Sequence, residues 1–347
     1  MVKTVEVVSL SRGIIGEPYM AHEIKLGTEI LESMGLKVRF SEHAMMGLEY
    51  IKDHPKERAE DLINAFKDPE IDMILCAIGG DDTYRTLPYL FENDELKNAV
   101  NDKIFLGFSD TTMNHFMLHK VGAKTFYGQS FLADVCELSG DMLPYSKSFF
   151  KELVTTGTIR EIRPSDVWYE ERTDFSESQI GVPRIKHDNN AGFELLQGKS
   201  VFSGKILGGC IDTIFDIFDN TRYEDSVSLC NKYGLFPALA DWKGRILLLE
   251  TSEEKPEPQR YEKMLSVLKE YGLFKVISGV IAGKPMDETY ADEYKKILVS
   301  ETDDPDLPIL FNVNIGHALP RCIIPFGVPA VADAEKQLIR FEPQVGN

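Results

Sequence analysis

The chain has 347 residues, of which 43% are hydrophobic and 27% charged, a composition typical of globular proteins rather than disordered or fibrous ones. Its length favours about two domains. Its formal net charge of −18 disfavours nucleic acid and anionic membranes as partners, because both carry negative charge.

The cysteines and the N-terminus indicate the cellular setting. No CxxC pair occurs, and an odd number of widely spaced cysteines predicts reduced thiols and no zinc site. The five cysteines are Cys76, Cys136, Cys210, Cys230 and Cys322. Glu6 interrupts the first apolar run, and no stretch of about 18 apolar residues follows. We therefore expect a soluble, cytoplasmic protein without a signal peptide or a membrane span.

The first half of the chain alternates short apolar runs with amphipathic stretches. The predicted strands are 5–9, 38–40, 72–78, 103–108 and 124–127. The predicted helices are 19–34, 56–66, 83–91 and 111–121. This alternation predicts a parallel sheet covered on both faces, with its ligand beyond the carboxyl ends of the strands.

The regular pattern is interrupted between residues 163 and 198 and then resumes. We predict three parts: a first domain over 1–162, a linker or substrate loop over 163–198, and a second domain over 199–347. The predicted strands of the second domain are 200–207, 245–249, 276–282, 309–311, 323–325, 330–332 and 337–341. Its predicted helices are 210–218, 259–271 and 291–300, and Gly208-Gly209 is predicted to be a tight turn.

Ser109 is the first candidate for chemistry. It follows a predicted strand directly and precedes a predicted helix, so its hydroxyl would project from the sheet beside the N–H groups of a helix N-terminus. That position suits a nucleophile, although the second glycine of a G-x-S-x-G elbow is absent. The alternative is that Ser109 only caps the helix.

Gly79-Gly80-Asp81-Asp82-Thr83 follows another predicted strand. The two glycines allow the backbone to approach a ligand or to adopt positive φ, although a plain turn would also use them. The segment resembles phosphate loops of phosphofructokinase-like and NAD-kinase-like enzymes. This leaves a phosphotransferase as one alternative, although two carboxylates would disfavour a polyphosphate.

His317 and Glu250 are candidates for the other groups that a serine nucleophile needs. His317 follows a glycine between two late strands and would supply a base with a pKa near neutrality. Glu250 ends a buried strand, where its carboxylate could orient an imidazole. Each has a plain structural alternative, an exposed loop histidine and an exposed strand end.

Three further side chains are weaker candidates. His115 and His119 have i, i+4 spacing, but no third ligand or glutamate accompanies them, so a structural role is favoured over a metal. Trp168 lies in the 163–198 segment, where it could stack on a planar ligand or pack between domains.

The joint order of these motifs resembles the LD-carboxypeptidase and microcin C immunity family of serine peptidases. The matching segments are 78–80, 87–90, 106–112, 125–128, 204–209, 246–250, 316–317 and 324–327. The resemblance implies an N-terminal flavodoxin-like domain, a C-terminal α/β domain with a barrel-like sheet, and a homodimer that requires no metal or cofactor.

The resemblance also implies a catalytic triad shared between the two domains. Ser109 would be the nucleophile, His317 the base and Glu250 the carboxylate that orients it. The backbone N–H groups of Gly80 and Asp110 would form the oxyanion hole.

Two features bear on the substrate that this resemblance implies. The segment 162–168 looks like the insertion of the microcin-immunity branch, in which a tryptophan stacks on a nucleotide base, so Trp168 becomes a candidate ligand contact. Gly79, Asp81 and Asp82 would also contact substrate. The immunity branch tends to carry uncharged residues at the two aspartates, and like charges about 4 Å apart repel by a few kcal/mol. The chain would then favour a substrate with an ammonium group over an anionic one.

We therefore expect a serine hydrolase that cleaves an amide bond in a small peptide-like substrate. One possibility is a muropeptide during peptidoglycan recycling, and the other is a toxic aminoacyl-nucleotide, whose cleavage would confer antibiotic resistance. The alternatives are a non-catalytic binding protein of the same fold and the phosphotransferase. Arg85, Arg184 and Arg321 are equally possible holders of a substrate carboxylate.

Overall fold

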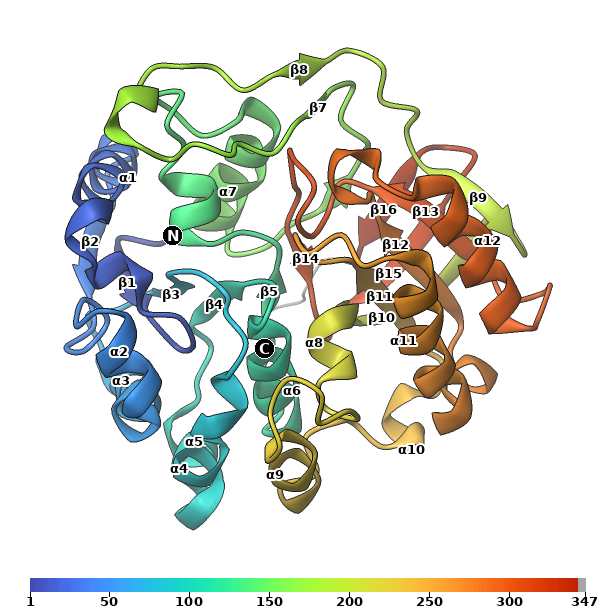
Figure 1. Ribbon diagram of the computed structural model, residues 1–347, viewed down its shortest axis with the longest axis horizontal. Helices are drawn as coiled ribbons and strands as arrows, with labels where there is room; N and C mark the ends of the chain where they lie inside the picture. The colour runs from blue at the N-terminus through green and yellow to red at the C-terminus, as the bar shows by residue number, and fades with distance from the viewer. Residues whose placement is uncertain (343–347) are drawn as a thin grey trace.

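The computed structural model describes residues 1–342 and contains two large sheets side by side (Figure 1). The first sheet has the order β14-β5-β4-β3-β1-β2. Its strands are β1 (Thr4–Val8), β2 (Lys37–Phe40), β3 (Met73–Cys76), β4 (Ile104–Gly107), β5 (Phe126–Tyr127) and β14 (Ile324–Pro325). The five N-terminal strands are parallel and follow the flavodoxin order 2-1-3-4-5, which confirms the predicted architecture.

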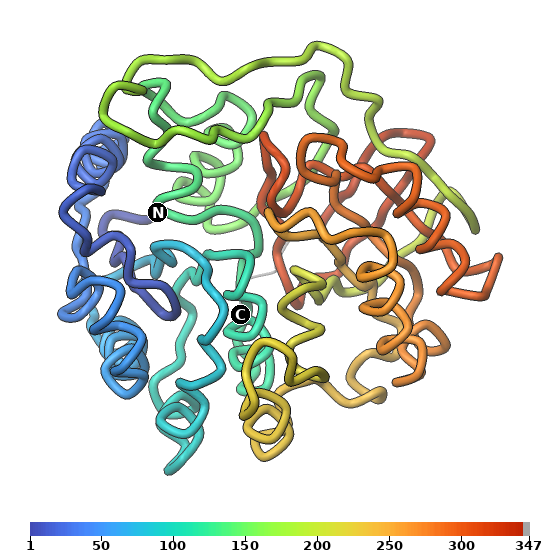
Figure 2. The backbone as a smooth tube through the Cα atoms, viewed as in Figure 1, coloured from blue at the N-terminus to red at the C-terminus, as the bar shows by residue number. Residues whose placement is uncertain are grey.

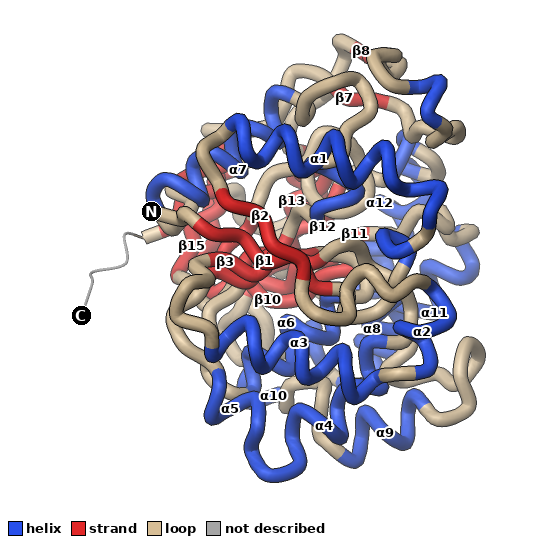
Figure 3. Tube along the Cα trace, turned by 90° about the vertical axis from the view of Figure 1, so that its left-hand side faces the viewer, coloured by secondary structure: helices blue, strands red, loops and turns tan. Residues whose placement is uncertain are grey.

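Helices cover both faces of this sheet, so its central strands are apolar throughout. Strands β1, β3 and β4 are buried along their whole length, as expected for a doubly covered parallel sheet. The helices are α1 (Ala21–Ser33), α2 (Leu48–Asp53), α3 (Pro55–Lys67), α4 (Leu87–Phe91), α5 (Glu95–Ala99), α6 (Thr111–Lys120) and α7 (Pro144–Thr156). Figure 3 shows α1 and α7 on one side of the strands and α3 and α6 on the other.

The second sheet has the order β6-β16-β15-β10-β11-β12-β13-β9. Its strands are β6 (Glu161–Ile162), β9 (Glu194–Gln197), β10 (Val201–Cys210), β11 (Ile246–Glu250), β12 (Gly279–Gly283), β13 (Ile309–Val313), β15 (Pro329–Asp333) and β16 (Leu338–Phe341). Strands β10 to β13 are parallel. Within residues 1–342, β6 and β9 are the two edges and do not pair with each other, so the sheet is open and is not a closed barrel.

The helices of this part follow the predicted βα alternation. They are α8 (Ile211–Phe215), α9 (Ser226–Lys232), α10 (Leu239–Trp242), α11 (Pro258–Tyr271) and α12 (Ala291–Thr302). No helix in the described part of the chain combines the length and apolarity needed to cross a bilayer.

Two strands cross the predicted domain boundaries. Strand β14 comes from the last quarter of the chain and pairs with β5, so it extends the first sheet. Strand β6 lies at the end of the first segment and pairs with β16 of the second sheet. Each of these strands links the two sheets. The domain boundaries after residues 162 and 198 stay a prediction.

The segment 163–198 passes over the junction of the two sheets (Figure 2). It contains a two-stranded ribbon, β7 (Trp168–Tyr169) with β8 (Lys186–His187), and ends in β9. This regular structure was not predicted, because each piece is too short to produce a periodic pattern.

Gly208-Gly209 is not the predicted turn. Strand β10 runs straight through both glycines and pairs with β11 as far as Cys210. Their φ values are +142° and +143°, and a Cβ on Gly208 would lie 2.0 Å from Leu248 O. The glycines allow two backbone segments to approach closely inside the sheet. Glycine pairs are also common in turns, so the sequence alone does not distinguish the two cases.

Candidate functional site

Ser109 occupies a sharp connection between β4 and α6. Its φ of +64° lies in the left-handed region, which is unusual for a residue with a side chain and typical of a nucleophile elbow. Thr112 Oγ1 donates to Ser109 O at 2.7 Å and accepts from the backbone N–H of Cys210 at 3.0 Å. The elbow is therefore held by α6 and by the end of β10 in the second part of the chain.

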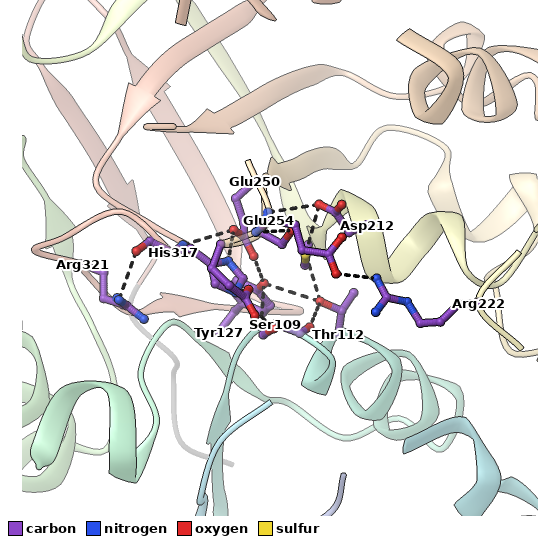
Figure 4. Close-up of polar contacts among 12 residues, drawn as sticks. Ser109, Thr112, Tyr127, Asp212, Arg222, Glu250, Glu254, His317 and Arg321 are labelled. Carbon is purple, nitrogen blue, oxygen red and sulfur yellow. Dashed lines mark hydrogen bonds and ion pairs between the residues drawn. The ribbon is translucent and has the colours of Figure 1, made fainter. Parts of the chain in front are cut away.

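His317 lies next to the Ser109 hydroxyl. The distance from His317 Nε2 to Ser109 Oγ is 3.1 Å, although 208 positions separate the two residues. The other ring nitrogen, Nδ1, lies 2.8 Å from Glu250 Oε2. Figure 4 shows the three side chains converging between the two halves of the molecule.

Both carboxylate oxygens of Glu250 accept hydrogen bonds in this network. Its Oε2 accepts from the His317 backbone N–H at 3.2 Å, and its Oε1 accepts from the Tyr127 hydroxyl at 2.6 Å. The Tyr127 oxygen in turn accepts from the Ser109 backbone N–H at 3.2 Å. Gly316 makes the close approach possible, because a Cβ there would lie 2.3 Å from Glu250 Oε2.

The charges around His317 favour its protonated form. Burial alone would lower its pKa, but the Glu250 and Glu253 carboxylates raise the pKa of His317 to about 10. Glu253 Oε2 lies 3.1 Å from His317 Nε2. The hydrogen bond to the His317 ring lowers the pKa of Glu253 to about 2. In this structure the imidazole therefore faces two carboxylates and one hydroxyl.

The glycine loop after β3 lies against Ser109. A Cβ on Gly79 would stand 2.8 Å from Ser109 Oγ and 3.2 Å from Asp110 N, so only glycine fits without displacement. A Cβ on Gly80 would stand 2.2 Å from Ser11 Oγ, and its φ is +154°. Burial raises the pKa of Asp110 to about 6, and the Asp110 carboxylate accepts from the Thr83 backbone N–H at 2.9 Å.

Asp81 and Asp82 each lie near an arginine, although Asp81 also remains partly exposed to the cavity. Asp82 is buried and pairs with the fully buried Arg58 at 2.6 Å. Asp81 accepts from the Tyr223 hydroxyl at 3.0 Å and lies 3.6 Å from Arg222. Arg58 and Arg222 therefore reduce the expected repulsion of an anionic substrate, although Arg222 also pairs with Asp216 and Glu254.

Trp168 is covered by His187 of the ribbon and by two residues outside it. Its ring stacks on His187 at 3.9 Å between centroids, Nε1 donates to Asn189 at 3.1 Å, and Lys284 Nζ lies 5.2 Å from the ring centre. Among the described residues, the lining of the cavity over Ser109 does not include Trp168. In this structure the Trp168 ring is not placed to contact a ligand beside Ser109.

A cavity of about 560 Å³ opens over Ser109 and His317. Such a volume accommodates a molecule the size of a nucleotide or a short peptide. Arg184 and Arg321 line it, but Arg184 pairs with Glu137 at 2.6 Å. Arg321 is buried over the Phe108 ring and donates to His317 O at 3.2 Å.

Other candidates have structural partners. His115 is completely buried, with Nδ1 2.7 Å from Thr125 Oγ1 and Nε2 3.1 Å from Gly107 O. Burial lowers the pKa of His115 to about 4, so the ring is neutral. Arg85 lies 3.6 Å from Asp225, and within the described residues it is absent from the cavity lining.

Cys210, Glu250 and His317 together offer donor atoms within 4.8 Å of one another, a set that zinc accepts. Both Glu250 oxygens and His317 Nδ1 already take part in short hydrogen bonds, at 2.6 and 2.8 Å. A metal would have to replace these bonds, so the donors fit a hydrogen-bonded network better than a metal site.

A serine on a strand–helix elbow, bonded to an imidazole that a carboxylate orients, is the arrangement of hydrolases with a nucleophilic serine. The chain also matches both domain models of one known family. The LD-carboxypeptidase N-terminal domain matches residues 5–128, and the LD-carboxypeptidase C-terminal domain matches residues 203–331. The chain belongs to the LD-carboxypeptidase family, which confirms the resemblance seen in the sequence.

Three relatives show how far the similarity extends. The chain is 62% identical to an MccF-like protein from Streptococcus pneumoniae solved in complex with AMP, with 99% of each chain covered and a TM-score of 0.97. It is 26% identical to the microcin C7 self-immunity protein MccF of Escherichia coli, over 92% of this chain and 87% of the relative. It is 25% identical to a probable murein peptide carboxypeptidase of Bacillus subtilis, over 94% and 90%.

The sequence did not predict the contacts of Tyr127, Thr112 and Glu253. Tyr127 ends the strand next to β4, so its place at the same sheet edge as Ser109 was a usable signal. Glu253 follows Glu250 by three residues in the loop after β11, and its approach to His317 depends on the path of that loop.

Proposed function

We propose that the protein is a serine hydrolase in which Ser109, His317 and Glu250 act as a catalytic triad. Ser109 Oγ attacks the carbonyl carbon of an amide while His317 Nε2 takes its proton. His317 then returns the proton to the leaving nitrogen, and the C–N bond breaks to give an acyl-Ser109. A water molecule, deprotonated by His317, hydrolyses this ester. The observation that carries the proposal is the continuous chain of hydrogen bonds from Ser109 Oγ through His317 to Glu250.

The backbone N–H groups of Gly80 and Asp110 are the proposed oxyanion hole. The Ser109 N–H is already directed to the Tyr127 hydroxyl, which leaves the next amide for the developing charge. The tight fit of Gly79 against Ser109 Oγ and Asp110 N supports the same arrangement.

The favoured substrate is an aminoacyl-nucleotide or a similar amide. The relative that is 62% identical was solved in complex with AMP, and the pairing of Asp81 and Asp82 with arginines reduces the repulsion of an anionic nucleotide. The second candidate is a muropeptide, which the Bacillus subtilis relative favours. Turnover of an aminoacyl sulfamoyl adenosine and of a muropeptide by one preparation separates the two.

Ser109→Ala tests the proposal directly. We expect turnover to fall by about three or more orders of magnitude, because the nucleophile is lost, while the melting temperature stays within a few degrees of wild type. Hydrolysis is followed by chromatography of the released amine. Undiminished hydrolysis by the Ser109→Ala variant contradicts the proposal.

The triad needs no metal, so we also propose that EDTA leaves hydrolysis unchanged. A cytoplasmic location and a homodimer are further parts of the proposal, and sedimentation velocity measures the oligomeric state.

A further inference from the structure

His317 Nε2 has two acceptors in this structure. Ser109 Oγ and Glu253 Oε2 each lie 3.1 Å from it, on different elements. The Glu253 side chain is 57% exposed, and His317 is its only ion-pair partner within the described residues. Glu253 therefore has one ion-pair partner in the described residues and solvent beside it, so its carboxylate can turn away from the ring.

The contact between Glu253 and His317 is incompatible with the first catalytic step. A carboxylate oxygen 3.1 Å from Nε2 requires a proton on Nε2, because two acceptors repel each other. Since Nδ1 faces Glu250, the ring is then an imidazolium and cannot take the Ser109 proton. The geometry describes a resting state of the site.

Further charges lie around this contact. The groups that face His317 or Glu253 from neighbouring elements are Glu250, Asp212, Cys210, Ser109, Arg321 and Arg12. Asp212 is 4% exposed, lines the same cavity, and its Oδ1 has no hydrogen-bond partner within residues 1–342. Glu253 and Asp212 thus offer carboxylate oxygens to a cation at this end of the cavity, beside the cationic Arg12 and Arg321.

We propose that Glu253 binds the free α-ammonium group of the substrate's acyl residue, and that this ion pair releases His317 Nε2 to Ser109. The inference rests on the proposed hydrolase function and names both its substrate class and the residue that couples binding to activation. Asp212 Oδ1, the oxygen of that carboxylate without a hydrogen-bond partner in the described residues, is a second acceptor for the ammonium group.

The position of Glu253 selects the α-ammonium group over a more distant one. Glu253 Oε2 and Ser109 Oγ each lie 3.1 Å from the same atom, His317 Nε2. An α-ammonium group is separated from the attacked carbonyl carbon by only one atom, so it reaches Glu253 while the carbonyl lies at Ser109. A residue whose amine is acylated presents no cation there.

The kinetic test compares an α-aminoacyl sulfamoyl adenosine with its Nα-acetyl derivative. Wild type is expected to hydrolyse the free amine at least about 10-fold better in kcat/KM, since one ion pair distinguishes the two. Glu253→Gln is expected to slow the free-amine substrate and to accelerate the acetylated one near pH 7, because His317 is no longer held as an imidazolium. Glu257→Gln, an equal charge change at an exposed residue further along the same loop, should keep the wild-type ratio.

A second readout does not depend on turnover. The Ser109→Ala variant binds the compounds without hydrolysing them. In this variant the His317 pKa, measured by NMR, should fall when the free-amine compound binds and should be unchanged by the acetylated one. Adding Glu253→Gln should lower this pKa before any ligand is present. A wild-type substrate ratio in the Glu253→Gln variant, or no change of the His317 pKa, overturns the inference while an inactive Ser109→Ala still supports the triad. Full hydrolysis by Ser109→Ala defeats the proposed function instead.

Discussion

At the scale of single residues, the positions of the catalytic side chains depend on glycines that lie against them. Ser109 has a positive φ, Gly79 lies against its side chain, and Gly316 lies against Glu250. The two glycines allow Ser109 Oγ and the Glu250 carboxylate to take their places, and a Cβ on either glycine would crowd these atoms. The site is therefore sensitive to substitutions that change no charged group.

Gly79→Ala tests this sensitivity. Its Cβ would lie 2.8 Å from Ser109 Oγ, so the nucleophile must shift, and a displacement of about 1 Å costs on the order of 100-fold in kcat. Steady-state kinetics measures the loss. Gly27→Ala in α1 is the control. The added Cβ would lie 2.3 Å from Cys136 Sγ, far from the triad in sequence, so we expect a lower melting temperature and a normal kcat. Equal kcat values for wild type and Gly79→Ala would contradict the role assigned to Gly79.

At the scale of elements, the strand–helix rhythm was predictable and the irregular pieces were not. Buried strands such as β1, β4 and β11 are continuous apolar runs, and the ends of β4 and β11 placed Ser109 and Glu250 correctly at strand termini. Helix α7 was missed, although Pro144 begins it and Gly157 ends it. The predicted helix 83–91 is a 3-10 turn, Thr83–Thr86, followed by α4.

Local signals failed where the meaning of a residue depends on a distant partner. The two glycines of β10 resemble a turn in the sequence, and only the approach of Leu248 O and Thr112 explains them. The arginines that neutralise Asp81 and Asp82 lie 141 and 24 positions away, as Arg222 and Arg58. Such pairings arise from the tertiary fold and leave no periodic pattern.

Gly209→Ala tests the contact between the two parts of the chain. Its φ is +143°, and its Cβ would lie 2.3 Å from Thr112 Oγ1, which bridges α6 and Cys210. We expect a loss of about 2–4 kcal/mol in the free energy of unfolding, measured in urea. Gly244→Ala, with φ +71° and nothing within 4 Å of its Cβ, should lose only about 1 kcal/mol. Equal losses in the two variants would show that crowding at Thr112 is unimportant.

At the scale of the whole molecule, stability and chemistry share the junction between the sheets. Strands β14 and β6 each join the sheet of the other half, and Ser109 meets Glu250 and His317 across the same junction. The family resemblance predicted this meeting, because the motifs occur in the family's order along the whole chain. Local sequence alone could not, since the three residues lie on separate elements.

Acid should weaken the fold through His115. Its pKa is about 4 when folded and 6.5 when unfolded, so the unfolded chain binds more protons between these values. Stability from this group is therefore present above pH 6.5, is lost as the pH falls toward 4, and amounts to about 3 kcal/mol. Urea unfolding of wild type and His115→Gln at pH 4.5, 5.5 and 7 measures it. Wild type should gain stability relative to the variant as the pH rises, and a constant difference would contradict the buried neutral ring.

The most direct measurement locates the acyl group during turnover. Protein quenched in acid while hydrolysing an aminoacyl sulfamoyl adenosine is digested, and its peptides are weighed by mass spectrometry. The account predicts the mass of the aminoacyl group on the peptide that contains Ser109, and its absence in Ser109→Ala. An acyl group attached to a different residue during productive turnover would contradict the central claim.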